Sequence, residues 1–110
     1  MEFENPRKMS REEIAQSFAS KDANKICDAL VSMAFYEENW KWSQDQCLLF
    51  LSHPNAQIRG LAAVCLGHIA RTHRHLNRAL VISSLKKLFN DEKIAGQVQD
   101  ALDDIQVFLK

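Results

Sequence analysis

Residues 48–69 of the chain read LLFLSHPNAQIRGLAAVCLGHI, which is its most informative stretch for the fold. An apolar segment ends at His53-Pro54-Asn55, and apolar residues then recur at spacings of three and four. Proline suits a turn or a first helical turn, and asparagine suits the residue that caps a helix. The stretch therefore predicts two helices joined by a short turn, the second of which buries one face.

Similar helix-start signals divide the rest of the chain. A capping box is expected where Ser10 is followed by Glu13, because each side chain can satisfy an amide of the other residue. Further predicted caps or breaks are Ser20, Asn39, Asn77 and the pair Asn90-Asp91. These signals predict six helices in three pairs within a single domain, residues 1–110, of which residues 1–9 form a loose lead-in.

An internal repeat supports the same organisation. When the chain is shifted by 36 residues, four sets of three positions on the second helix of each pair are apolar throughout. These sets are Ile26, Ala62 and Val98; Ala29, Cys65 and Ala101; Leu30, Leu66 and Leu102; and Met33, Ile69 and Ile105. One helical hairpin cannot cover its own apolar face, whereas stacked hairpins share a continuous core. The predicted fold is therefore an all-α solenoid of about three antiparallel helical hairpins.

Composition excludes several classes of protein. The chain has 110 residues, of which 46% are hydrophobic and 25% charged, as in ordinary globular domains. Lys and Arg balance Asp and Glu at 14 each, and this zero net charge argues against a nucleic-acid binder. The apolar stretches are shorter than the ~20 residues that span a bilayer. No signal peptide is recognised, so a cytoplasmic location without membrane attachment is expected.

The three cysteines, Cys27, Cys47 and Cys65, indicate neither a disulfide framework nor a zinc site. Their number is odd, and no two of them form a CxxC motif. Reduced thiols in a cytosolic protein fit this pattern. Cys65 falls on the apolar face of its helix, so we expect it to be chemically inert.

The stretch quoted above resembles a HEAT repeat. The resemblance is carried by Pro54 in the turn, Ile58-Arg59, the paired alanines at 62–63, and the LGHI tail at 66–69. It implies an α-solenoid in which Arg59 pairs with an acidic residue of a neighbouring turn, either Asp22 or Asp91. The third hairpin departs from the pattern, because it lacks the arginine after Ile94 and has Asp103 in place of the glycine.

A narrower resemblance extends over residues 25–109. It rests on WKWSQDQCL at 40–48, the His-Pro pair at 53–54, CLGHIARTHR at 65–74 and DALDDI at 100–105. These motifs resemble small bacterial immunity proteins of contact-dependent inhibition and polymorphic toxin systems. The resemblance implies a cytoplasmic antidote that binds one cognate toxin domain, often a nuclease, and blocks its active site.

The predicted partner-binding residues lie mainly on the second helix of each hairpin. The 36-residue shift places Asp28, His68, Asp100 and Asp104 on one face, and Asp103 extends the acidic cluster. Such carboxylates can form a solvated face, or they can recognise a basic cleft and accelerate association with it. Paired carboxylates could also serve acid–base chemistry, but no complementary group accompanies them.

Other candidates lie near the turns. Glu37, Glu38 and Trp42 are included because an exposed tryptophan is a good interface anchor, although Trp42 could instead pack against the first hairpin. Arg71 belongs to a basic cluster with three histidines, His68, His73 and His75, in the neighbourhood. This cluster could complement a helix C-terminus or bind an anion, and its spacing does not suit a metal site.

Four functions were weighed. A toxin inhibitor is preferred, and a generic HEAT-like adaptor is the main alternative. A nucleic-acid binder would use the basic cluster of residues 71–78, but the zero net charge of the chain argues against this function. An enzyme is not expected, because the phosphate-loop, hydrolase, zinc-protease and dinucleotide motifs are all absent. No cofactor or metal is predicted.

Overall fold

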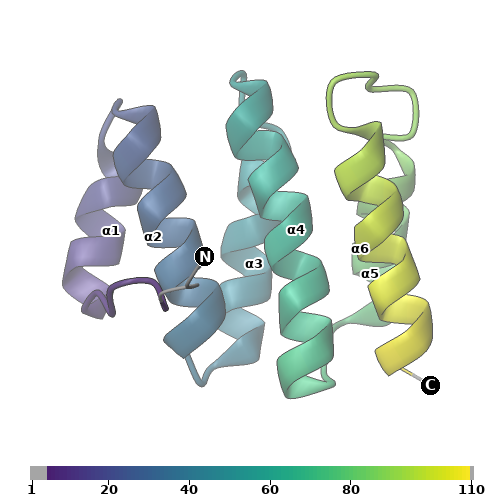
Figure 1. The fold of residues 1–110 in the computed structure, drawn as a ribbon, viewed down its shortest axis with the longest axis horizontal. Helices are drawn as coiled ribbons and strands as arrows, with labels where there is room; N and C mark the ends of the chain where they lie inside the picture. Colours follow the sequence, from purple (N-terminus) through teal and green to yellow (C-terminus); the bar gives the residue numbers. More distant parts are fainter. Residues whose placement is uncertain (1–4, 110) are drawn as a thin grey trace.

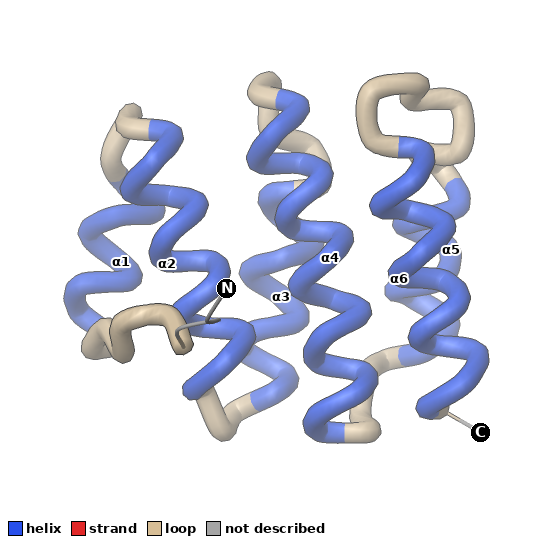
Figure 2. Tube along the Cα trace, in the orientation of Figure 1, coloured by secondary structure: helices blue, strands red, loops and turns tan. Residues whose placement is uncertain are grey.

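The computed structural model describes residues 5–109 of the chain. Their secondary structure consists of helices and loops, without strands (Figures 1 and 2). The helices are α1 (Arg11–Ala19), α2 (Ala23–Tyr36), α3 (Trp40–Phe50), α4 (Ala56–His73), α5 (Arg78–Lys86) and α6 (Ala95–Phe108). The prediction of an all-α protein with six helices is confirmed. None of these helices is long and apolar enough to cross a membrane.

The helices form three antiparallel pairs placed side by side (Figure 1). In one layer, α2, α4 and α6 contact one another in that order, and α1, α3 and α5 lie behind them. The contact between α4 and α6 is the most extensive of any helix pair. This arrangement is compatible with the predicted solenoid, because each hairpin packs chiefly through its second helix.

Side-chain caps begin five of the six helices. Ser10 and Glu13 form the predicted capping box, and Asn39, Asn55 and Asn77 cap α3, α4 and α5 as expected. The prediction for α2 was wrong, because Asp22 rather than Ser20 caps this helix. The Ser20 hydroxyl instead donates to the Ser17 carbonyl oxygen at 2.7 Å, which closes the end of α1.

The repeated apolar positions form the core. Eleven of the twelve residues predicted from the 36-residue shift are buried, and only Leu102 is half-buried. The core also includes Cys47 and Cys65, where a hydrogen bond from Cys47 to Cys65 and complete burial raise the pKa of the Cys47 thiol. A protonated, buried thiol is a poor nucleophile, as expected for structural cysteines.

The second and third hairpins are connected by an ion pair between their turns. The Arg59 guanidinium lies 2.9 Å from the Asp91 carboxylate, which resolves the two partners left open by the sequence. Arg59 also donates to the carbonyl oxygens of His53 and Pro54, at 3.0 and 2.9 Å. One arginine therefore satisfies the turn before α4 and holds the turn before α6 against it.

The described part of the lead-in, residues 5–9, has no regular secondary structure but is attached to α2. Tyr36 donates its hydroxyl proton to the Pro6 carbonyl oxygen at 2.6 Å. The Met9 amide donates to the buried Ser32 hydroxyl at 2.8 Å. The segment therefore lies across the exposed side of α2 and forms part of that face (Figure 1).

Candidate functional site

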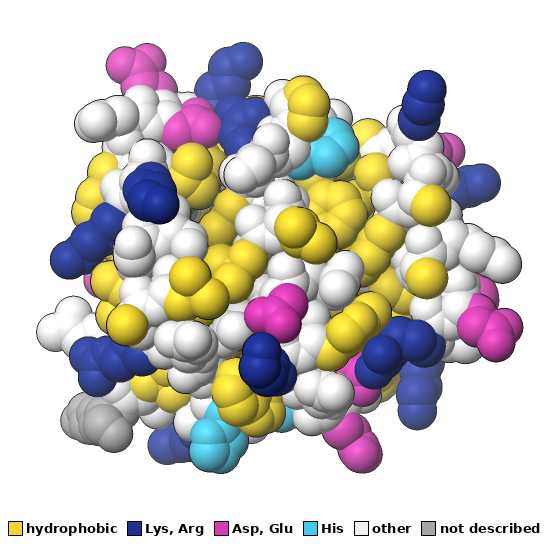
Figure 3. All heavy atoms as spheres, turned by 180° about the vertical axis from the view of Figure 1, so that it is seen from behind, with side chains coloured by type: hydrophobic (Ala, Val, Ile, Leu, Met, Phe, Trp, Pro, Cys, Tyr) yellow, Lys and Arg dark blue, Asp and Glu magenta, His cyan; other side chains and the backbone are white. Residues whose placement is uncertain are grey.

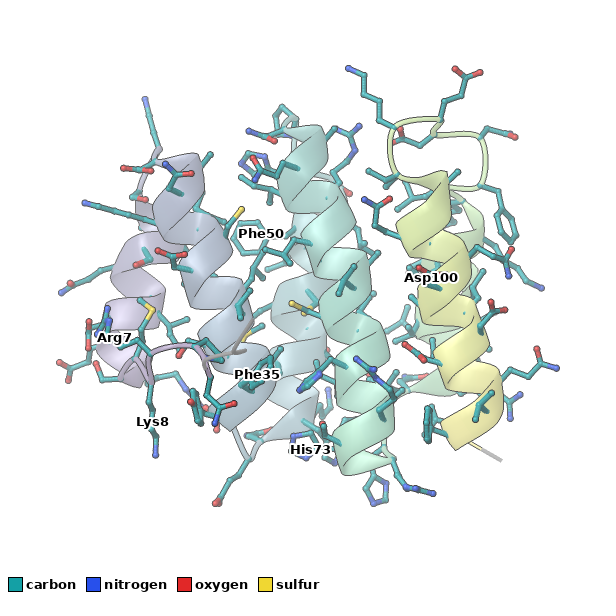
Figure 4. The ribbon with its side chains drawn as sticks, in the orientation of Figure 1. Arg7, Lys8, Phe35, Phe50, His73 and Asp100 are labelled. Atoms are coloured by element: carbon teal, nitrogen blue, oxygen red, sulfur yellow. The ribbon has the colours of Figure 1, made fainter. Side chains whose placement is uncertain are left out.

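The exposed face of α2, α4 and α6 contains a cluster of aromatic and charged side chains. The Phe35 ring stacks on the His68 ring, with centroids 4.5 Å apart and an interplanar angle of 16°. Figure 4 shows Phe35 at the end of α2, directed toward α4. Arg71 follows His68 by three residues on α4, and its Nε lies 3.8 Å from the Asp104 carboxylate of α6. Side chains from all three hairpins thus meet in one place.

We name this cluster the α4 patch and define it as Phe35, Val64, His68, Arg71 and Asp104. Phe35 and Val64 are 47% and 42% exposed, although both are large apolar residues. Val64, His68 and Arg71 share one side of α4 because they are separated by four and three residues. The patch therefore combines an exposed aromatic ring with an arginine, two residue types that are enriched at the centres of protein interfaces, and with one acidic side chain.

The environment of His68 favours its neutral form. Burial lowers the pKa of His68 below its usual 6.5, and the positive charges of Arg71 and His73 lower it further, while Asp104 opposes them. The Nδ1 atom of His68 also lies 3.5 Å from an Arg71 nitrogen. A neutral imidazole can stack closely on Phe35 while Arg71 supplies the positive charge of the patch.

Asp104 is fixed by packing as well as by charge. Its carboxylate lies so close to Gly67 that a Cβ added there would be 2.7 Å from Oδ2. The glycine therefore makes room for an acidic side chain between α4 and α6. The predicted solvent-facing role of Asp104 is thus limited, because the side chain is half-buried between these helices.

The other predicted acidic residues are more open. Asp100 is exposed on α6, two turns from the end of the helix (Figure 4), and has no ion pair or hydrogen bond within residues 5–109. Asp103 accepts a hydrogen bond from Gln99 at 2.9 Å on an exposed surface. Asp28 is exposed on α2 and lines a depression with Pro6 and Arg7. Asp28 and Asp100 therefore flank the α4 patch on its two neighbouring helices.

Glu37, Glu38 and Trp42 belong to a different region. The Arg11 guanidinium lies over the Trp42 ring, 3.8 Å from its centroid, and pairs with Glu37. Burial raises the pKa of Glu37, but the Asn39 amide and the Arg11 charge lower it more, so the net shift is downward. Trp42 is half-buried against the first hairpin, which matches the burial alternative, and Glu38 is exposed in the adjoining turn.

The basic cluster after α4 is divided among separate contacts. His75 stacks on Trp40, with centroids 5.6 Å apart, and Arg74 lies over the Phe108 ring at 5.4 Å. Within residues 5–109, no group of three histidine, cysteine or acidic residues could hold a metal ion.

Two members of the α4 patch were missed as site residues. Phe35 was not among the predicted site residues, because its sequence context, like that of Trp42, fits partial burial as well as an exposed anchor. Val64 occupies the position of the 36-residue repeat that corresponds to Asp28 and Asp100. Its exposure could have been inferred from these two charged residues. The contact between Phe35 and His68 had no sequence signal, since the two residues lie on different helices and are 33 positions apart in the chain.

No family model matches the chain, so membership of the HEAT family stays a prediction, and no curated protein matches it either. A solved structure is similar over the whole length. It is a chain in the crystal structure of a CDI (contact-dependent inhibition) complex from Cupriavidus taiwanensis LMG 19424. The two chains are 31% identical and superpose with a TM-score of 0.90, covering 100% of this chain and 99% of that one. This chain therefore belongs to the same family as that component of the CDI complex.

Proposed function

We propose that the chain is an immunity protein that binds and neutralises the toxin domain of a contact-dependent inhibition system. The observation that carries the proposal is the end-to-end similarity to a chain of a CDI complex. Because the similarity covers the full length, all three helical hairpins of this chain correspond to the other chain, and not one hairpin alone. The proposed site of action is the cytoplasm, where an incoming toxin domain would be met.

The α4 patch is the proposed centre of the toxin-binding surface. Phe35 offers a rigid aromatic anchor, because its stacking on His68 already restricts its rotamers. Asp28 and Asp100 on either side would provide the rim charges that orient the partner. If the toxin domain is a nuclease, these carboxylates would face the basic cleft that binds its substrate.

The proposed mechanism is steric and electrostatic inhibition without catalysis. Several of the candidate groups already have partners within the chain: Asp104 pairs with Arg71, Asp103 accepts from Gln99, and His68 stacks on Phe35. A catalytic site would need a nucleophile or base within hydrogen-bonding distance of a common reacting atom. Binding alone suffices for an inhibitor.

The first experiment is a rescue test in bacteria. The toxin domain encoded beside this chain is expressed with and without it, and growth and co-purification are measured. Restored growth together with a stable complex is the expected result. Toxicity that persists although the chain is folded and abundant would refute the inhibitor function. A complex with a non-toxic neighbour would favour the alternative, a generic interaction adaptor.

A matched pair of variants tests the proposed surface. Phe35→Ala should weaken toxin binding by about 2 kcal/mol or more, as expected for an aromatic anchor. Phe89→Ala is the control, because Phe89 is 44% exposed but lies between α5 and α6, away from the patch. Calorimetric titration of the toxin domain measures both. Equal affinities of the two variants would show that the toxin-binding surface does not include Phe35.

Charge reversal provides a second pair. Asp100→Lys should slow association with the toxin domain, whereas Glu92→Lys, in the turn before α6, should not. Asp104 is unsuitable for such a test, because its substitution would also disturb the contact with Gly67 and Arg71. Stopped-flow association rates at low and high salt distinguish steering from structural damage.

A further inference from the structure

The zero net charge of the chain conceals a long segment without acidic residues. Residues 46–90 contain no Asp or Glu, but they contain six Lys or Arg residues. These six are Arg59, Arg71, Arg74, Arg78, Lys86 and Lys87. Arg59 and Arg71 pair with Asp91 and Asp104 from outside the segment. The other four have no carboxylate within ion-pair distance in the described part of the chain.

The outer side of α5 is where this unpaired charge collects. A shallow groove along the helix is lined by Arg78, Ala79, Ile82, Ser83, Lys86 and Lys87. Arg78 begins the helix and the two lysines end it, so the groove has positive charge at both ends and small or apolar residues between them. Figure 3 shows dark blue side chains along this edge of the rear face, with yellow side chains beside them.

The groove continues toward the C-terminal end of α6. Arg78 also lines a neighbouring depression with Arg74, His75 and Phe108, and it donates to the Leu109 carbonyl oxygen at 2.9 Å. Arg74 has a φ of 55°, in the left-handed region that residues with side chains seldom adopt. This conformation ends α4 and turns the chain toward α5, which places Arg74 beside Arg78.

We propose that this basic groove, defined by Arg74, Arg78, Ile82, Lys86 and Lys87, binds an acidic protein segment that also carries apolar residues. The charge complementarity is direct, because the groove presents four cations and no acidic side chain. The apolar complement is Ile82 with its neighbour Ala79 in the groove. Acidic side chains would pair at the two ends while an apolar residue covers Ile82.

An acidic protein segment fits this surface better than a nucleic acid does. Nucleic-acid affinity without sequence preference grows with the number of phosphates that Lys and Arg neutralise, or comes from aromatic rings on which bases stack. Helix α5 has no aromatic residue, and the groove offers only four arginine and lysine side chains. Helix α5 lies behind α6 (Figure 1), and the groove runs along α5 whereas the α4 patch is formed by α2, α4 and α6, so the two surfaces can be occupied independently.

The test uses the full chain labelled with ¹⁵N and a short synthetic peptide of glutamate and leucine. The largest amide shifts are expected in residues 74–87. Lys86→Glu with Lys87→Glu should weaken binding at least about tenfold, since two contacts become repulsive. The matched control, Lys21→Glu with Lys25→Glu, reverses two exposed lysines of the first hairpin and should leave the affinity unchanged. A peptide with lysine in place of glutamate should not bind.

Several outcomes would overturn the proposal. Shifts that map outside residues 74–87, or the absence of shifts, would do so. Tighter binding of duplex DNA at the same residues would assign the groove to nucleic acid instead. Self-association that Lys86→Glu with Lys87→Glu abolishes in sedimentation would assign it to a second copy of the chain. Lys86→Gln with Lys87→Gln, which removes charge without reversing it, guards against misfolding, and its circular dichroism should equal that of the parent chain.

Discussion

The two helices of the third hairpin are opposite in charge and in packing. Helix α6 contains three aspartates and no Lys or Arg, whereas α5 contains Arg78 and Lys86 and no acidic residue. Helix α6 makes the most extensive helix contact in the molecule, with α4, while α5 packs mainly on α6. A net charge of zero therefore describes a sum, and the individual surfaces are strongly charged.

This difference changes the meaning of the composition. A net charge of zero argues against a strongly charged binding partner if the positive and negative side chains are mixed over the surface. It does not do so if they are separated. Here Asp104 of α6 lies against α4 and Asp100 and Asp103 are exposed, whereas the basic side chains at the two ends of α5 line a separate groove. The same hairpin can thus present an acidic surface to one partner and a basic surface to another.

The strongest way to test the packing difference is to remove a buried side chain from α6. Ile105 is fully buried, so Ile105→Ala should lower the free energy of unfolding by about 2–5 kcal/mol. Leu80→Ala on α5 should lower it by less, about 1 kcal/mol or below, because Leu80 is 46% exposed. Urea denaturation measures both changes. Equal losses would show that α5 is as firmly packed as α6.

The second largest effect is expected at the ion pair that joins the turns. The side chains of Arg59 and Asp91 are only 17% and 21% exposed. Arg59→Ala should therefore cost about 2 kcal/mol of stability, as it leaves Asp91 and two carbonyl oxygens without this donor. Arg59→Lys should recover less than half of the loss, because an ammonium cannot span all three acceptors.

Lys87→Ala is the matched control on α5, and thermal unfolding reports the series. Lys87 has no ion pair within residues 5–109, so its removal should leave the melting temperature nearly unchanged. A loss as large as that of Arg59→Ala would mean that the charge on α5 is structural and is not available to a partner.

A smaller effect is expected where α6 approaches α4. Gly67→Ala should destabilise the chain by about 1–2 kcal/mol, because the new Cβ would press on Asp104 and on the Ala101 backbone. Gly96→Ala, with open space around its Cβ position, should instead be neutral or stabilise by up to about 1 kcal/mol. Opposite signs in chemical denaturation would support the close approach. Two stabilising substitutions would contradict it.

The smallest expected effect concerns pH. The pKa of His68 is lower in the folded chain than its usual 6.5, so the unfolded state binds more protons between these two values. Stability should therefore fall as the pH drops from about 7.5 through 6.5 toward the folded pKa, and level off below it. His68→Asn should flatten this slope in urea titrations at several pH values. If the change of stability with pH is the same in the variant, a group other than His68 causes it.

The sequence predicted the core and most helix starts correctly, because both depend on local information. Apolar spacing indicates which side of a helix is buried. The 36-residue repeat did so for every one of its positions except Leu102. A cap needs only a side chain and the amides two or three residues later, as at Asn39 and Asn55. The error at Ser20 arose because Asp22, two residues on, competes for the same role.

The candidate site was predicted less well, because it depends on contacts between hairpins. Asp28, His68 and Asp100 were placed on the correct helices, but the stack of His68 on Phe35 was not foreseen. Trp42 was considered as an exposed anchor, and its cover by Arg11 comes from another helix. The basic cluster of residues 71–78 was recognised, but its continuation along α5 to Lys86 and Lys87 was not, since net charge does not reveal where charges collect.

Local patterns in the chain were thus sufficient to specify six helices, four of their caps and an apolar core with a 36-residue period. The partners of polar side chains depended on the assembled fold: Asp91 for Arg59, Phe35 for His68 and Asp104 for Arg71. The physical reason is range. Helix formation and apolar periodicity act within a few residues, whereas stacking and ion pairing require side chains about 30 residues apart to meet, and only packing of the hairpins brings them together.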